Sequence, residues 1–204
     1  MNARVVTDEM RVYYDQRAGE YDDWWLGTGL FAQRVRPKRP EEVTTLIDML
    51  SALPPGRWLD VACGTGFLTQ HLRGDVVALD QAAAMIDIVS ARLPTARAVC
   101  GEAVPLPFAD ATFDRILTSH FYGHLLGPER DAFLREARRV ARGLVVIDSA
   151  LREDVEPEDW QLRALNDGSQ HRVYKRHFTA PQLAEELGGG NTLHDGHWFV
   201  AVEA

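Results

Sequence analysis

Apolar and polar positions along the middle of this chain follow two rhythms in turn. Short apolar runs of the strand type alternate with stretches in which apolar residues recur at helical spacing. The strand-like runs cover 57–61, 75–79, 96–100, 113–118 and 144–147, and the helical stretches between them cover 67–72, 82–93 and 129–141. Strands that alternate with helices pair in parallel through right-handed crossovers. The pattern predicts an α/β fold with a doubly wound, mostly parallel sheet.

The N-terminal part of the chain departs from this alternation. We expect an arm with a helix over 7–21, followed by a loop over 22–29 that carries two tryptophans. An amphipathic helix is predicted over 40–53, because a proline opens it and a Pro-Pro-Gly stop follows at 54–56.

The C-terminal part is predicted to close the sheet with an antiparallel hairpin. Helices are expected over 157–166 and 180–187. After them, the apolar runs 192–194 and 197–202 flank Asp195-Gly196, a dipeptide suited to a type I′ hairpin turn. These two runs bring the predicted sheet to seven strands.

Composition and charge limit the partners and the location that we expect. The net charge is −8, from 22 basic and 30 acidic residues. This balance argues against a nucleic-acid partner, which usually needs a basic face. No apolar run approaches the roughly 20 residues of a membrane span, so no membrane partner is expected. No secretory signal is visible over 1–10, and Cys63 and Cys100 do not suggest a disulfide framework. The default expectation is a cytoplasmic protein.

The most informative motif spans the end of the first predicted strand. Residues 58–67 read W-L-D-V-A-C-G-T-G-F, and the next strand ends at Asp80. Gly64 and Gly66 let the backbone bend tightly and approach a ligand, and the predicted helix after them offers free N–H groups. Asp80 is suited to accept hydrogen bonds from two ribose hydroxyls. The motif predicts a nucleoside site at the carboxyl ends of the strands.

Two side chains indicate which nucleoside fits. A dinucleotide fingerprint needs a third glycine, and Thr69 stands in its place, where it hinders a pyrophosphate. Asp60 adds a negative charge, which suits a ligand with a cationic group and repels a diphosphate. Both features favour S-adenosylmethionine (SAM), which carries an ammonium and a sulfonium and no phosphate.

On these residues the chain resembles the class I SAM-dependent methyltransferases, in particular the small-molecule group that includes quinone and natural-product methyltransferases. The resemblance runs over about 13–147, from the arm to the fifth strand. It rests on D-V-A-C-G-T-G, on L-P-F followed by F-D at 106–114, and on E-x-x-R-V at 136–140. The family usually continues with Pro-Gly-Gly, of which only Gly143 remains here.

The resemblance implies a set of cofactor contacts in the arm, in the glycine turn and at the strand ends. They are Tyr21, Asp60, Ala62, Cys63, Gly64, Gly66, Asp80, Gln81, Met85, Gly101, Glu102, Ala103 and Ser119. Glu102 stands where the family more often has an aspartate. The implied cofactor is SAM, with S-adenosylhomocysteine (SAH) as its product. No metal is expected, because Asp148 alone does not make a metal site.

In this family the residues after the fourth strand face the transferred methyl group. Here they include His120 and His124, and an Asn/Asp-Pro-Pro-Tyr segment is absent, which disfavours methylation of amino groups. A histidine can take a proton from a phenol, an enol or a carbon acid. The alternative is that both histidines only pack.

Tyr174, in the basic segment 170–178, is a further catalytic candidate that can close over an anionic substrate; the alternative is an exposed basic loop. Trp24 and Trp25 form either an aromatic lid or packing anchors.

The implied function is direct SN2 transfer of a methyl group to an oxygen or carbon atom of a small organic acceptor. A tRNA-modifying or other enzyme that uses SAM on the same fold is one alternative, and a non-catalytic cofactor-binding regulator is another. We expect a single methyltransferase domain over 1–204. It comprises a lid or arm over 1–40, a cofactor-binding core over 41–150, and a substrate-side insert with the hairpin over 151–204. Whether it is a monomer or a homodimer stays open.

Overall fold

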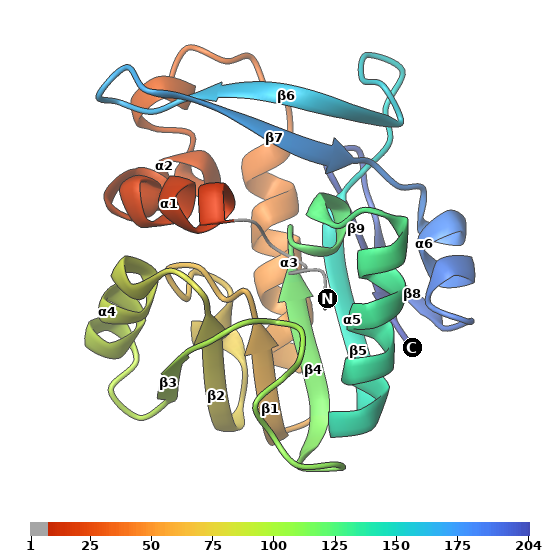
Figure 1. Cartoon of the computed structure of the whole chain (residues 1–204). Coiled ribbons are helices and arrows are strands. Elements are labelled where there is room, and N and C mark those ends of the chain that lie inside the picture. The colour runs from red at the N-terminus through yellow and green to blue at the C-terminus, as the bar shows by residue number, and fades with distance from the viewer. Residues whose placement is uncertain (1–7) are drawn as a thin grey trace.

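The computed structural model describes residues 8–204, which centre on a seven-stranded sheet (Figure 1). The strand order is β3-β2-β1-β4-β5-β9-β8. The strands are β1 Gly56–Val61, β2 Gly74–Asp80, β3 Arg97–Cys100, β4 Phe113–Ser119, β5 Ala141–Ser149, β8 Asn191–Asp195 and β9 Phe199–Glu203. β1 to β5 are parallel, and β9 runs antiparallel to β5 and to β8. The predicted fold class, its mostly parallel sheet and its closing hairpin are confirmed.

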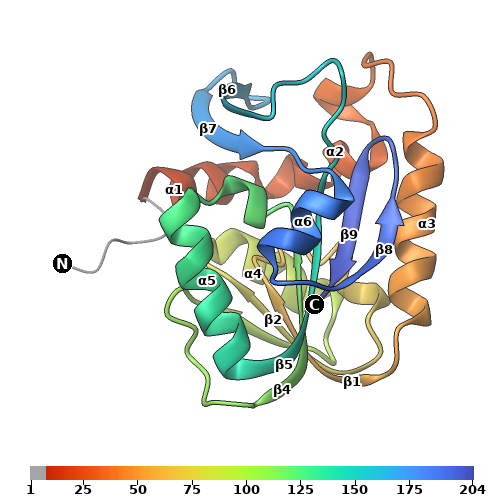
Figure 2. The same cartoon turned by 90° about the vertical axis from the view of Figure 1, so that its right-hand side faces the viewer.

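Helices cover both faces of this sheet. They are α3 Arg39–Ala52, α4 Ala83–Arg92, α5 Gly127–Val140 and α6 Ala180–Glu186. Figure 2 shows α3 on one face and α5 with α6 on the other. Leu46 and Leu50 of α3 pack on Trp58, whereas Phe133 of α5 and Leu183 of α6 belong to the cluster on the opposite face. The apolar periodicity that predicts these helices therefore corresponds to real buried stripes.

The connection between β1 and β2 differs from the prediction. The helix predicted over 67–72 is wrong, because only a single 3-10 turn forms there, η3 Thr69–His71. Since α3 already covers this face of the sheet, Leu68 and Leu72 pack into the α3 cluster without needing a full helix. The helix N-terminus expected to offer N–H groups to a ligand is therefore absent from this connection.

A second, two-stranded sheet replaces the helix predicted over 157–166. β6 Glu158–Ala164 pairs antiparallel with β7 Gln170–Arg176. The helical prediction is wrong because Trp160, Leu162 and Ala164 follow a period of two, which fits a strand. Tyr174 is buried on β7, so the alternative of an exposed basic loop is also wrong.

The arm is more helical than predicted. It consists of α1 Asp8–Arg17, η1 Ala18–Glu20, α2 Tyr21–Leu26 and η2 Gly29–Phe31, and residue 7, the first of the predicted helix, lies outside the described residues. The loop predicted over 22–29 is thus helical as far as Leu26. Trp25 is buried and stacks on Phe67, with ring centroids 5.0 Å apart, so it is a packing anchor.

The closing hairpin forms, but its turn is not of type I′. That turn needs positive φ at both central residues, and neither Asp195 nor Gly196 has one. The turn keeps a local bond from the Gly196 N–H to the Phe199 carbonyl at 2.9 Å, and a carboxylate from α3 adds to it: Glu42 accepts the backbone N–H groups of His197 and Trp198 at 2.9 and 3.0 Å.

Candidate active site

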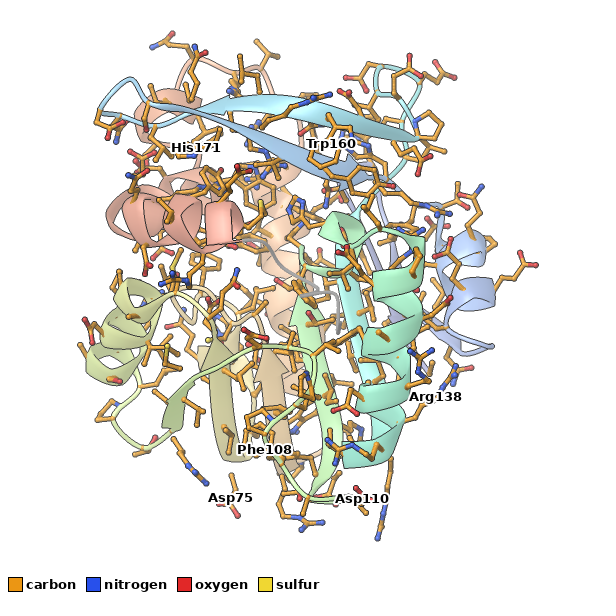
Figure 3. The ribbon with its side chains drawn as sticks, viewed as in Figure 1. Asp75, Phe108, Asp110, Arg138, Trp160 and His171 are labelled. Atoms are coloured by element: carbon orange, nitrogen blue, oxygen red, sulfur yellow. The ribbon has the colours of Figure 1, made fainter. Side chains whose placement is uncertain are left out.

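A cavity of about 670 Å³ lies at the carboxyl ends of the parallel strands. Its floor includes Ala62, Gly64 and Asp80, and Trp160 and His171 of the β6–β7 ribbon also line it. Figure 1 shows α1, α2 and this ribbon across the strand ends, and Figure 3 places Trp160 and His171 on the ribbon. The size and position are those of a small-molecule site in an open α/β sheet.

The glycine turn at the cavity floor is held by the acid that ends β2. Asp80 accepts the N–H of Gly64 and the N–H of Ala82, each at 2.9 Å. Gly64 has φ +55°, and a Cβ added there would stand 3.1 Å from the ring of Tyr21. Burial raises the pKa of Asp80 to about 6, against the effect of these hydrogen bonds. A carboxylate has about four acceptor positions, so Asp80 can hold the turn and still accept bonds from a ligand.

Asp60 lies beneath the turn and does not line the cavity. Its Oδ2 accepts the hydroxyl of Thr69 at 2.6 Å, and its buried Oδ1 has no hydrogen-bond partner. Burial raises the pKa of Asp60 to about 7. Thr69, which the sequence marks as an obstacle to pyrophosphate, therefore serves here to orient the acid.

Most of the predicted cofactor contacts come together in this cavity. Those that line it are Tyr21, Ala62, Gly64, Asp80, Gln81, Gly101, Ala103 and Ser119, and those outside its lining are Asp60, Cys63, Gly66, Met85 and Glu102. Met85 is fully buried in a cluster with Ala82. A Cβ added at Gly66 would lie 3.3 Å from the side chains of Leu93 and Val89, so the residue packs against α4. These two positions support the turn and the adjacent helix from below.

The predicted catalytic candidates His120, His124 and Tyr174 also line this cavity. His120 directly follows β4 and has φ +53°, a left-handed conformation that is uncommon outside glycine. Non-glycine residues held in this region cluster at functional sites. The backbone conformation therefore marks His120 independently of the resemblance.

Aromatic rings and cations surround the imidazole of His120. Trp24 and Phe199 contact it with ring centroids 4.6 and 5.5 Å away. Its Nδ1 lies 3.4 Å from Ser149 Oγ and 3.7 Å from Asp148 Oδ1, whereas the buried Nε2 has no partner. Burial, reinforced by nearby cations, moves the pKa of His120 well below its ordinary value. The ring is therefore neutral at pH 7.

His124 is held in one tautomer. Its Nδ1–H donates to the backbone carbonyl of Tyr174 at 2.5 Å, since a carbonyl can only accept. The Nε2 atom therefore carries the lone pair. Burial and the charges of Lys175 and Arg163 move the pKa of His124 well below its ordinary value. A neutral imidazole of fixed orientation is suited to accept a proton.

Tyr174 is held in place by two contacts. Its hydroxyl donates to Glu158 on β6 at 2.5 Å, and its carbonyl fixes His124. Burial and the bond to Glu158 raise the pKa of the Tyr174 hydroxyl. Through its carbonyl Tyr174 orients His124, and the catalytic role predicted for its hydroxyl stays a prediction.

A second cavity, of about 300 Å³, adjoins the first across a shared wall. The residues common to both linings are Tyr14, Tyr21, His120 and His124. Sequence reasoning missed this cavity because its basic side chains come from separate segments. The basic cluster at 34–39 and the basic segment 170–178 are the local signals for it.

Among the described residues, no helix is both long and apolar enough to cross a membrane. Within 8–204, no group of three or more histidine, cysteine, aspartate or glutamate side chains is arranged to hold a metal ion.

Comparisons with known proteins agree with this geometry. Residues 59–147 match the family described as "Methyltransferase domain". An uncharacterized methyltransferase of Alkaliphilus oremlandii is 27% identical over 79% of this chain and 75% of that protein. A demethylmenaquinone methyltransferase of Renibacterium salmoninarum is 35% identical over 66% of this chain, which spans 55% of that relative.

Among solved structures, the complex of DhpI with SAM and HEP is similar to this protein. The match covers 100% of this chain and 99% of the DhpI chain, with a TM-score of 0.79 and 24% sequence identity. The likeness establishes the fold over the whole length, while the matched domain contains the glycine turn and the ends of β1, β2 and β4. Residues 59–147 therefore form a methyltransferase domain, and the chain as a whole has the fold of the class I S-adenosylmethionine-dependent methyltransferases.

Proposed function

We propose that this chain transfers the methyl group of SAM to an oxygen or carbon atom of a small organic acceptor by direct displacement and releases SAH. The observation that carries the proposal is the single cavity that joins Gly64 and Asp80 to His120 and His124. In that cavity the predicted cofactor contacts stand next to groups able to receive a proton.

The residues at the cavity floor fit SAM. Asp80 retains acceptor positions for ribose hydroxyls, and the unpaired Oδ1 of Asp60 supplies negative charge beneath the turn. Gln81 and Gly101 line the same wall, where an adenine is expected. When bound, SAM supplies a methyl group activated by a positively charged sulfur.

The chain's own residues contribute position, exclusion of water and proton acceptance. The α1 helix and the β6–β7 ribbon cover the cavity, which is consistent with a lid function for 1–40 and a substrate-side function for 151–204. Fixed orientation of two reactants alone supplies effective molarities of about 10⁵ M or more. His124 Nε2 takes the acceptor's proton where the acceptor is not already ionised.

Two measurements test this function. Calorimetry with SAH should detect binding, and NAD should not bind. A panel of small acceptors, including a demethylated quinol of the kind named for the Renibacterium relative, is then screened for SAM-dependent methylation. Binding of NAD in place of SAH would contradict the proposal.

Asp80→Asn is expected to weaken SAH binding by about tenfold or more, because a charge-assisted hydrogen bond contributes about 1.5–3 kcal/mol. Calorimetry measures the change. Asp75→Asn is the matched control: Asp75 lies on the same strand but is exposed at the opposite end of the molecule (Figure 3). Equal affinities of the two variants would remove Asp80 from the cofactor site.

The affinity for SAM is expected to rise from about pH 5 to about pH 8. Burial raises the pKa of Asp80 to about 6 and that of Asp60 to about 7, from 3.8. Between pH 3.8 and these raised pKa values, the folded apo-protein holds protons on Asp60 and Asp80 that the unfolded chain has released. The stability of the apo-protein therefore falls as pH rises through this range. A cationic ligand favours the ionised acids, and its binding should release protons. Calorimetry in buffers of different ionisation enthalpy measures the release; an affinity independent of pH would contradict this.

A further inference from the structure

The second cavity is strongly basic although the chain as a whole is acidic. Its lining includes Arg36, Arg39, Arg163 and Lys175. Among the described residues that line it, none is an aspartate or a glutamate. The net charge of the chain is −8, so this concentration of positive charge is not a property of the whole surface.

Three side-chain nitrogen atoms of the described residues at this cavity are buried without a hydrogen-bond partner. They are Arg36 Nη1, Arg39 Nη2 and His120 Nε2. Arg39 is only 3% exposed. A buried polar atom without a partner costs about 1–3 kcal/mol, and more when it is charged. A group with acceptor oxygens would supply the missing partners.

Neighbouring contacts hold the Arg39 guanidinium in place at this wall. Its Nη1 donates to the carbonyl of Trp25 at 3.0 Å, and its charge lies over the ring of Trp24 at 4.2 Å. Both contacts leave Nη2 available. The side chain is therefore preorganised before any ligand arrives, which lowers the entropic cost of binding.

The positive charges repel one another. Burial and the neighbouring guanidinium of Arg36 lower the pKa of Arg39 to about 10. Burial and the charges of Arg34 and Arg152 lower the pKa of Arg36 to about 10 as well. Lys175 forms a buried ion pair with Asp148, whereas Arg163 donates to the neutral amide of Gln161 at 3.2 Å. Arg152, which also lines the cavity, pairs with Asp154 at 2.9 Å, so positive charge remains uncompensated chiefly at Arg36 and Arg39.

We propose that this cavity binds a doubly charged oxyanion group of the phosphate or phosphonate type, carried by the methyl acceptor. The inference rests on the proposed function, to which it adds the substrate class. The shared wall at His120 and His124 connects the anion site to the cavity assigned to the cofactor. An acceptor anchored by its anionic group therefore presents its other end towards the methyl group.

The arrangement of the donors favours a tetrahedral dianion over a carboxylate. Arg36 and Arg39 come from the segment that leads into α3, His120 follows β4, and Arg163 with Lys175 comes from the β6–β7 ribbon. Donors that converge from three elements match a group whose oxygens point in several directions. A planar carboxylate matches one bidentate guanidinium and leaves the other donors unpaired.

The test uses the full-length protein with inorganic phosphate as the probe, and acetate for comparison. Binding of SAH is measured first by calorimetry in every variant. Phosphate is then titrated with and without SAH, at low and high salt. We expect phosphate to bind more tightly than acetate, and Arg36→Gln to weaken phosphate binding by about tenfold with SAH affinity unchanged. Arg142→Gln, which removes the same charge from an exposed site outside this cavity, should leave phosphate binding unchanged.

The outcomes separate the two proposals. Absence of phosphate binding in a protein that binds SAH overturns the anion site and leaves the methyltransferase function standing. Phosphate binding without SAH binding overturns the function and supports the anion site. Equal losses in Arg36→Gln and Arg142→Gln would mean non-specific attraction and overturn the site. Arg39→Gln is expected to give a larger loss than Arg36→Gln; if its thermal melt shows that it does not fold, Arg36→Gln decides.

Discussion

Asp148→Ala is expected to lower the free energy of unfolding by about 3–5 kcal/mol, as for other buried charges that lose their partner. Asp148 is fully buried and forms an ion pair with Lys175. It also accepts the N–H groups of Gly123 and Ser149, each at 2.7 Å, and lies 3.7 Å from His120 Nδ1. The substitution leaves the ammonium of Lys175 and two backbone donors without an acceptor. Urea denaturation followed by circular dichroism measures the loss.

A control and a double variant make this result specific. Asp110→Ala removes an aspartate that pairs with Arg139 at 2.9 Å but is 80% exposed, and a much smaller change is expected. Lys175→Met combined with Asp148→Ala should destabilise less than the sum of the two single variants, because neither charge of the buried pair then remains. Additive effects would mean that the two side chains do not act as a pair. Lys175→Met provides the measurement if Asp148→Ala does not fold.

His124→Ala is expected to lower kcat by about 10²-fold, at the lower end of the range for a lost proton acceptor, because its lowered pKa makes it a weak base. The Nδ1 bond to Tyr174 fixes the tautomer that leaves Nε2 free to accept. The rate of SAH formation with an acceptor found in the screen measures the effect, and SAH affinity should stay the same.

The exposed His197 supplies the matched control, since His197→Ala removes an imidazole on the hairpin, outside both cavities. His120→Ala tests the neighbouring ring in the same assay. If neither His120→Ala nor His124→Ala slows turnover, the chain uses no histidine base, and the acceptor reaches the site already ionised. Loss of SAH binding in His124→Ala would point instead to a role in holding the cofactor.

The sheet was predictable from the sequence because its central strands are buried on both faces. Runs such as 76–79 and 144–147 are continuously apolar, a pattern typical of parallel strands that helices cover on both faces. The glycine turn was predictable for a different reason. The backbone at Gly64 has positive φ and lies close to the ring of Tyr21, so the residue type records a local constraint.

The errors arise where distant contacts decide the local structure. The stretch 67–72 has a helical pattern, but α3 covers the surface that a helix there would have used. Within the described part of the chain, strand β6 pairs with β7 alone, and the short alternation of Trp160, Leu162 and Ala164 does not by itself show the strand that it pairs with. The basic cavity joins side chains from the arm, from the end of β4 and from the ribbon, and each alone reads as an ordinary charged residue.

The link between Glu42 and the hairpin turn has a consequence for folding. The donor at His197 is 155 residues away along the chain from the carboxylate that accepts it. Closing so long a loop costs entropy that grows with its length, and contacts of large sequence separation slow folding. Until α3 has docked, the N–H groups of His197 and Trp198 lack the acceptor that Glu42 provides. The antiparallel end of the sheet, formed from the last residues of the sequence, thus waits for the first long helix before its strands can settle into register.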